Sequence, residues 1–571
     1  MLLEILRSDF FVLWWATMLF ALVVGTFYGV VRNWRDPLKI SISFGNWGRM
    51  EWLGAIGLGA YLSVYVFSIL FAADVASLDQ WQLTDFALRG EIYPVQILPT
   101  SGRFFPLHLQ EFHLIENLTR DPVGLHSIVI LQFFVFLALA YFLLSDLTVI
   151  SRLAVIGALT LLPGVFVPFS GFVYPERNLL FFLALMAFFV RGFSEGRHWL
   201  FLAGALAATQ CMLYFKEPAF IIILGFTASR LFWSWRYDSR DVFRSIRTFS
   251  TVHVLEIALI ILSSIYLVLF LIVLFPLDSL AYVESSRVDL LASIATYARV
   301  NPLLLCFFAV LATRLVKMAV GTLQPDRFWD GLAIGVGMYG AAIVSLGLYT
   351  SYYMAPADFV GVMYLGRVIA QASRSHTDWR RITAAIVGCC VLAISATHTV
   401  FLWYERKGMV STASELADFL IENSDDRQVR LRFPFGTDAD ETSYYLMELY
   451  SYLDYRGLPV ANYAESDSSS SGVIVLETPH ANPQNRCASW HTAGCFQSVD
   501  DGRQRFDVRS PTDWLSGDST DVGEDSPELL FVSDRFLVRG LACSVFRYLY
   551  SAGHSDPMPD HWPSLRVTLS P

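Results

Sequence analysis

The feature that most constrains this chain is a series of apolar runs, each close to the length that crosses a lipid bilayer. A transmembrane helix needs about 20 mostly apolar residues, and such runs recur from Phe11 to Leu402. Only 16% of the residues are charged, so we expect an α-helical polytopic membrane protein. By the length criterion there are about twelve spans, at residues 10–31, 52–72, 125–144, 150–168, 176–193, 198–214, 218–233, 253–276, 302–320, 330–349, 352–372 and 382–403.

The composition changes after Tyr404 to Asp, Ser, Gly and Arg with isolated apolar segments. This tail carries 14 Lys and Arg against 26 Asp and Glu, a net charge of −12, which gives no reason to expect a nucleic-acid partner. Its patterns predict a small α/β domain, with helices near 412–422 and 442–455 and strands near 428–433, 472–477 and 529–532. We therefore expect a transmembrane domain at 1–403 and a soluble domain at 404–571.

Basic residues predict the orientation of the chain in the membrane. They gather in the loops after the first span and at 230–252, 314–329 and 367–381. The positive-inside rule makes the side that holds these loops cytoplasmic. The loop at 73–124, the loop at 276–301 and the tail then face outward. We expect a multi-pass protein of a bacterial inner membrane with an extracytoplasmic C-terminal domain.

The polar outer loop at 73–124 is the first candidate for chemistry. It contains Asp74, Asp79 and Asp85, the sequence Leu78-Asp79-Gln80-Trp81 and the sequence Gly102-Arg103-Phe104-Phe105-Pro106. Two of its segments, 79–89 and 107–118, mix apolar and polar positions as helices lying on a membrane surface do. Carboxylates, an arginine and aromatic side chains at the membrane surface suit a site that works on a lipid-bound substrate.

Two outward turns add charge beside expected helix starts. They are Tyr174-Pro175-Glu176-Arg177 and Tyr214-Phe215-Lys216-Glu217-Pro218. Proline favours the first turn of a helix, and the positive end of a helix dipole favours anions. One interpretation is that Lys216 binds a phosphate while Glu217 orients it or binds a sugar hydroxyl. The alternative is a local Lys216–Glu217 ion pair or snorkelling of the lysine.

These motifs resemble the integral-membrane glycosyltransferases of the GT-C fold, which use polyprenyl-phosphate sugar donors. The sequence Tyr352-Tyr353-Met354-Ala355-Pro356 on a late span and the C-terminal outer domain add to the resemblance. It implies that an acid of the first outer loop is the general base. Many members have Asp-Asp or Asp-Glu there, whereas this chain has Asp-Gln, so the base stays open between Asp79 and Asp74. The span at 10–31 is an addition to the family's usual pattern.

The resemblance implies an inverting glycosyltransferase that moves a sugar from a polyprenyl-phosphate donor to an extracytoplasmic glycan or lipid-linked acceptor. The requirement for a divalent cation stays open, because the family includes metal-dependent and metal-independent members. The chain has no dense His or Asp cluster that argues for a tight metal site. The expected donor phosphate ligands are Lys216, Arg103 and Arg177. The expected substrate contacts are Glu217, Glu176, Trp81, Tyr352, Tyr353 and His113.

Three other functions fit parts of the pattern. A transporter or flippase for lipid-linked glycans would need polar residues in the middle of spans and internal repeats, and the chain has little of either. A polysaccharide polymerase or ligase of another fold would use His108 or His113. A scaffold whose outer domain binds a partner would have no need for the carboxylates of the outer loop.

Overall fold

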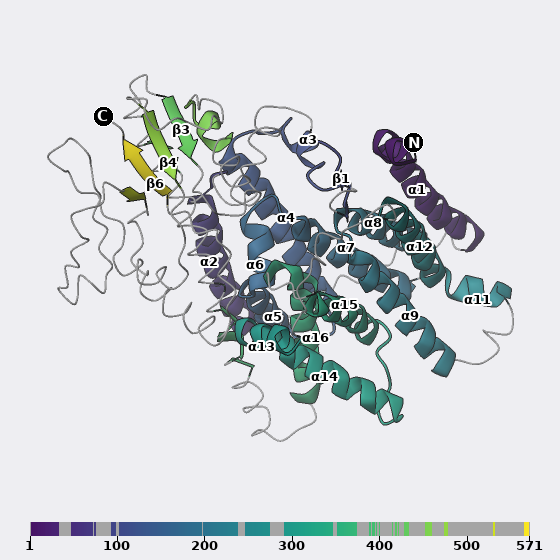
Figure 1. Cartoon of the computed structure of the whole chain (residues 1–571). Coiled ribbons are helices and arrows are strands. Elements are labelled where there is room, and N and C mark those ends of the chain that lie inside the picture. Colours follow the sequence, from purple (N-terminus) through teal and green to yellow (C-terminus); the bar gives the residue numbers. More distant parts are fainter. Residues whose placement is uncertain are drawn as a thin grey trace. The chain divides into compact units, whose positions relative to one another are not determined.

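The computed structural model describes residues 2–32, 47–71, 73–75, 93–98, 102–196, 198–237, 246–274, 290–346 and 351–373, together with short stretches between 388 and 569. These residues divide into two compact units (Figure 1). The first unit comprises Met1–Phe67, Tyr93–Leu114 and His126–Thr399, and the second comprises Ser68–Ile92, Ile115–Leu125 and Val400–Pro571. The second unit therefore joins part of the predicted outer loop to the tail.

The first unit is helical, which confirms the predicted fold class. Every expected span up to 352–372 coincides with helical segments, and the last one, 382–403, lies largely outside the described residues. The main helices are α1 (Leu2–Arg32), α2 (Arg49–Phe71), α4 (Pro122–Leu143), α5 (Val149–Thr160), α6 (Pro163–Ser170), α7 (Pro175–Gly196), α8 (Trp199–Phe215), α9 (Ala219–Tyr237), α12 (Val254–Leu274), α14 (Pro302–Ala319), α15 (Trp329–Ser345) and α16 (Ala355–Ser373). Shorter elements are α3 (Phe112–Ile115), α11 (Ile246–Val252), α13 (Leu290–Val300) and the 3-10 turn η3 (Ser351–Met354).

Proline positions explain several helix ends and one correction. Helices α4, α7 and α14 begin at a proline, whose missing N–H costs nothing in the first turn. The prediction of one span at 150–168 is wrong in detail, because α5 and α6 meet at an angle of 66°. Pro163 begins α6, and a proline there cannot continue the hydrogen bonding of α5. In the described part of the chain, five helices are long and apolar enough to cross a membrane, or six if the bent pair is one span.

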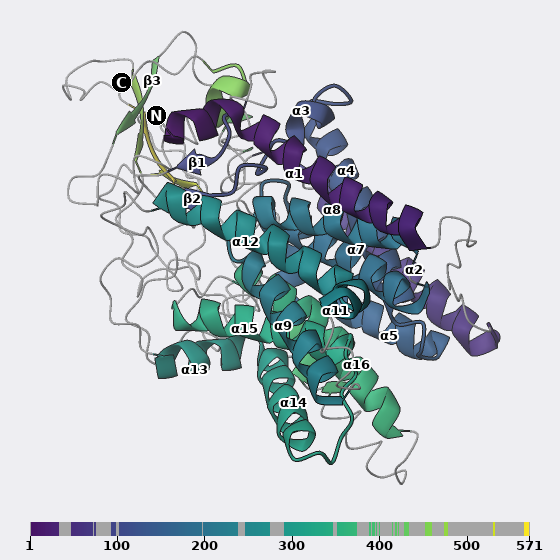
Figure 2. The ribbon, with the colours of Figure 1, turned by 90° about the vertical axis from the view of Figure 1, so that its right-hand side faces the viewer.

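Close helix packing holds the first unit together. Helix α8 packs against α1 and α7, and α9 packs against α12 and α15 (Figure 2). At Gly335 of α15, an added Cβ would lie 2.4 Å from the carbonyl oxygen of Ile222 in α9. Only a residue without a side chain allows this approach, as is common where membrane helices cross. The α9–α15 contact is therefore determined by glycine.

The outer loop differs from its predicted structure. A helix at 107–118 is wrong over most of its length, because only α3 is helical there. Leu109 has a φ of 63°, a left-handed conformation that interrupts a right-handed helix. Before it, β1 (Ile97–Leu98) pairs antiparallel with β2 (Arg103–Phe104). The second predicted surface helix, 79–89, lies outside the described residues.

The second unit contains a four-stranded sheet in the order β3-β4-β6-β5. Strands β3 (Gln428–Arg432) and β4 (Val473–Glu477) pair in parallel, whereas β6 (Leu565–Leu569) pairs antiparallel with β4 and with β5 (Leu529–Phe531). Three of these strands coincide with the predicted ones, and β6 was not predicted. The tail residues described here therefore have the expected α/β character.

Candidate functional site

The loop that contains β2 is anchored to the end of α8 and to the interior of α12. The Leu107 backbone N–H donates to the Tyr214 carbonyl at the end of α8, at 3.1 Å. The Tyr266 hydroxyl of α12 donates to the Phe104 carbonyl, at 3.3 Å. Phe104 is fully buried against the rings of both tyrosines. These contacts bring the Gly-Arg-Phe-Phe-Pro motif to the turn between α8 and α9.

Lys216 lies in that turn and pairs with a different helix. Its Nζ is 2.7 Å from Oε1 of Glu176 in the first turn of α7, and it lies 4.7 Å above the Tyr353 ring. Burial by itself would lower the pKa of Lys216, but the Glu176 carboxylate holds that pKa above its ordinary value. Lys216 is therefore a buried, protonated cation. Glu176 is fully buried as well.

Glu217 pairs with the outer loop. Its Oε1 accepts a hydrogen bond from Arg103 Nε at 2.8 Å and another from the Phe104 backbone N–H at 3.3 Å. Burial opposes its charge, but Arg103 and then Lys216 hold the pKa of Glu217 below its usual value. The Arg103 guanidinium lies 4.4 Å above the Phe105 ring. The predicted alternative of a local Lys216–Glu217 pair is thus wrong, because each side chain pairs with another segment.

Arg177, the third predicted cation, pairs with a residue that the sequence interpretation passed over. Its Nη2 donates to Oε1 of Glu111 at 2.7 Å, and Asn178 Nδ2 donates to the same oxygen at 2.6 Å. Burial raises the pKa of Glu111 although Arg177 opposes the rise. Glu111 lies within the segment predicted as a surface helix. Its charge within a segment of mixed apolar and polar residues was the available signal.

His108 is buried near the cations of the three ion pairs. Burial first, and then the charges of Lys216, Arg103 and Arg177, hold the pKa of His108 well below its ordinary value. All three cations are therefore close enough to act on one imidazole, which stays neutral. Consecutive residues of α7, Glu176 and Arg177, belong to two of the pairs. The three cations predicted from the sequence are thus brought together.

The predicted aromatic contacts line the same region. The Tyr352 ring packs against Tyr174, with centroids 5.1 Å apart, and against Tyr353. Tyr339 of α15, which the sequence interpretation missed, donates to the Tyr353 carbonyl at 2.8 Å. His113 lies elsewhere on the loop, with Nε2 3.4 Å from the Tyr93 carbonyl.

Asp74 belongs to the second unit, unlike the cation cluster. Its Oδ2 accepts a hydrogen bond from the Tyr452 hydroxyl at 2.8 Å, and its Oδ1 accepts one from the Val75 N–H. Burial raises the pKa of Asp74. Arg456 continues this network by donating to the Tyr452 hydroxyl. Asp79 and Trp81 lie outside the described residues.

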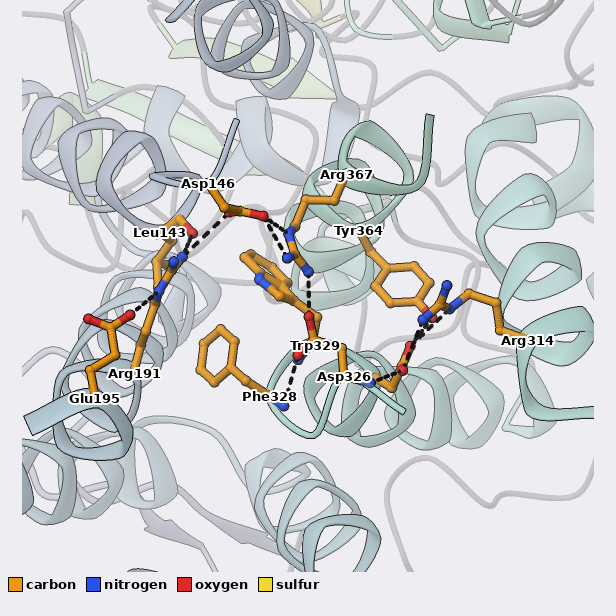
Figure 3. Close-up of polar contacts among 11 residues, drawn as sticks. Leu143, Asp146, Arg191, Glu195, Arg314, Asp326, Phe328, Trp329, Tyr364 and Arg367 are labelled. Carbon is orange, nitrogen blue, oxygen red and sulfur yellow. Dashed lines mark hydrogen bonds and ion pairs between the residues drawn. The ribbon is translucent and has the colours of Figure 1, made fainter. Parts of the chain in front are cut away.

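A second charged network occupies the other ends of the helices (Figure 3). Arg367 of α16 pairs with Asp146 and Asp326, and Arg191 of α7 approaches Asp146 and Glu195. Arg191 is fifteen residues after Glu176, which corresponds to about 22 Å along α7. Arg367, from the predicted cytoplasmic loop at 367–381, therefore belongs to an ion-pair network far along α7 from the Lys216 cluster.

Within the same network, Asp330 of α15 is fully buried. Its two oxygens accept hydrogen bonds from Arg314, both at 3.0 Å, and one also accepts from the Tyr364 hydroxyl. Asp330 of α15 is thus bound by residues of α14 and α16, so this part of the network suits a scaffold that ties α14, α15 and α16 together. Among the residues that the structure describes, no group of three or more His, Cys, Asp or Glu could hold a metal ion.

Comparison with known proteins finds similarity to solved structures. No family model matches the chain, and no curated protein sequence matches it. The crystal structure of ArnT from Cupriavidus metallidurans in the apo state is similar over 79% of this chain and 97% of that chain, with 12% identity and a TM-score of 0.36. At this identity and TM-score, the similarity supports no assignment of a role to any residue and no assignment of a reaction.

Proposed function

We propose that this protein is a membrane glycosyltransferase that moves a sugar from a polyprenyl-phosphate donor to an extracytoplasmic glycan or lipid-linked acceptor. In this proposal residues 1–403 carry catalysis and residues 404–571 form an extracytoplasmic domain. The site is the cluster of Lys216, Arg103 and Arg177 with its carboxylate partners. The protein would be embedded in the inner membrane of a bacterium.

The observation that carries the proposal is a buried, protonated lysine at the start of a helix in an apolar protein. Lys216 is 4% exposed and precedes α9, whose N-terminus is the positive end of its dipole. Cations and helix N-termini stabilise phosphate groups. Arg103 reaches the same turn through Glu217. A lipid phosphate is the anion expected for a protein of this hydropathy.

The reaction requires few groups from the protein. A carboxylate takes the proton of the acceptor hydroxyl as its oxygen attacks the anomeric carbon. The bond between that carbon and the phosphate oxygen breaks, and the lipid phosphate leaves with the electron pair. Lys216 and Arg103 would stabilise its charge. Both oxygens of Asp74 already accept hydrogen bonds, which makes Asp79 the first candidate for the base.

The test compares two variants of the purified full-length protein. Asp79→Asn keeps the size of the side chain but removes the base, so transfer should fall by about 10²–10⁴-fold while undecaprenyl phosphate still binds. Lys216→Ala removes a charge-assisted contact worth about 1.5–3 kcal/mol, so undecaprenyl phosphate should bind more weakly. Transfer is measured with a panel of radiolabelled polyprenyl-phosphate sugars, and binding is measured by intrinsic fluorescence.

Lys317→Ala is the matched control, because Lys317 is an exposed lysine near the end of α14. It should change neither transfer nor binding. Normal transfer by a stably folded Asp79→Asn protein would exclude Asp79 and make Asp74 the next residue to test. If neither aspartate affected transfer, or if Lys216→Ala bound undecaprenyl phosphate normally, the proposed function would be wrong.

A further inference from the structure

Arg177 and Glu111 leave hydrogen-bonding groups unused inside the protein. Arg177 is 1% exposed, yet its Nε and Nη1 have no hydrogen-bond partner among the described residues. The second oxygen of Glu111, Oε2, is also buried and has no partner there. Unsatisfied buried polar groups are rare in native proteins and commonly mark the place of a ligand or ordered water. A guanidinium with two free donors beside a free carboxylate oxygen is an unusual combination.

The pair is held rigidly beside the proposed phosphate site. Asn178 donates to Oε1 of Glu111 and accepts from Gln132 Nε2 of α4 at 2.9 Å. Arg177 directly follows Glu176, the partner of Lys216. Its guanidinium lies 6.0 Å from the centroid of the Phe112 ring, and that ring packs against Phe172. The free donors and the free acceptor are therefore fixed next to aromatic surface.

The chemistry of these groups distinguishes between possible ligands. A phosphate could accept from Arg177, but it has no proton to offer the carboxylate of Glu111, and the two negative charges would repel each other. A sugar hydroxyl both donates and accepts. Two neighbouring hydroxyls would satisfy the Glu111 oxygen and the Arg177 donors together. The pair is thus better suited to a neutral diol than to an anion.

We propose that Arg177 and Glu111 form the subsite for the sugar of the donor, in which Glu111 Oε2 accepts from one hydroxyl and Arg177 donates to that hydroxyl and its neighbour. This inference rests on the proposed function, and it replaces a phosphate role for Arg177 with a role in selecting the sugar. Lys216 and Arg103 remain the phosphate ligands. Donors that lack one hydroxyl of this diol bind poorly.

The test measures how much the sugar adds to lipid binding. The probes are undecaprenyl phosphate and undecaprenyl phosphate that carries glucose or arabinose, with deoxy counterparts of each sugar. Wild-type protein should bind at least one sugar-bearing lipid about tenfold more tightly than undecaprenyl phosphate. Removal of one particular hydroxyl from that sugar should abolish this gain in affinity. Glu111→Gln should lose the gain while binding undecaprenyl phosphate within about twofold of wild type.

Glu195→Gln is the matched control, because Glu195 pairs with Arg191 at the other end of the same helix. It should keep the gain. Equal weakening of every lipid by Glu111→Gln would make the pair a phosphate site and overturn the proposal, and so would the absence of any sugar preference in wild-type protein. The deoxy series on wild-type protein decides the case if Glu111→Gln fails to fold. Failure of wild-type protein to bind undecaprenyl phosphate would instead overturn the proposed function, whereas weakening of all lipids by Lys216→Ala supports it.

Discussion

At the scale of single residues, the most informative side chain is the neutral His108 among three cations. Burial and these cations hold its pKa well below the ordinary value of about 6.5. Below that pH the unfolded chain binds a proton that the folded protein does not. His108 therefore makes no difference to the pH dependence of stability above about pH 6.5, and stability is lost as the pH falls below it.

We expect the midpoint of thermal unfolding to fall between pH 7 and pH 5, with His108 contributing at most about 1.4 kcal/mol per pH unit. The His108→Asn variant should show a shallower fall, because the titrating group is gone. The measurement is differential scanning fluorimetry of full-length protein in detergent. An unchanged slope in His108→Asn would show that the imidazole is not held neutral by its surroundings.

At the scale of elements, a glycine decides how closely α9 and α15 approach each other. In Gly335→Ala the new methyl group would meet the backbone of α9 at Ile222, and backbone cannot move aside as a flexible side chain can. Overpacking of this kind costs about 1–3 kcal/mol. We therefore expect a lower unfolding midpoint for Gly335→Ala, measured in detergent by circular dichroism.

Gly59 of α2 provides the control, because an added Cβ there meets no atom of the described chain within 4 Å. Gly59→Ala should be neutral or slightly stabilising, since alanine favours a helix over glycine. Equal midpoints for the two variants would mean that α9 and α15 separate easily.

The break between α5 and α6 also has a local cause. Pro163 begins α6, and the length of an apolar run, from which the single span at 150–168 was predicted, takes no account of proline.

At the scale of the whole molecule, the orientation in the membrane follows from the distribution of positive charge. Alkaline phosphatase is active only outside the cytoplasm, so a fusion after Tyr404 should be active and a fusion after Arg240 should be inactive. The physical reason is the retention of basic loops on the cytoplasmic side. An inactive fusion at Tyr404, at normal expression, would reverse the orientation and place the Lys216 cluster on the cytoplasmic face.

The organisation of the chain into two units was not accessible from local pattern. Asp74 follows α2 directly, yet its hydrogen-bond partner Tyr452 is 378 residues later in the chain. The same unit includes part of the outer loop and the residues after Val400. A sequence pattern reports on neighbours along the chain, and it carries no information on which distant segment supplies a hydroxyl group.

The sequence by itself determined the helical membrane class, the positions of most helices and three strands of the tail sheet. These follow from the length of apolar runs, from proline at helix starts and from alternation in strands, all of which act over a few residues. It also predicted Lys216, Arg103 and Arg177 as cations of one site, because each lies in a turn or loop that is predicted to face outward.

Only the tertiary structure decided how these charges are paired. Lys216 pairs with Glu176 rather than with adjacent Glu217, and Glu217 pairs with Arg103, 114 residues away. Burial makes each unpaired charge costly, so the partner is the carboxylate that the packing of α7, α8 and the outer loop brings within reach. The same packing leaves buried groups of Arg177 and Glu111 without a hydrogen-bond partner among the described residues, which no spacing in the sequence could show.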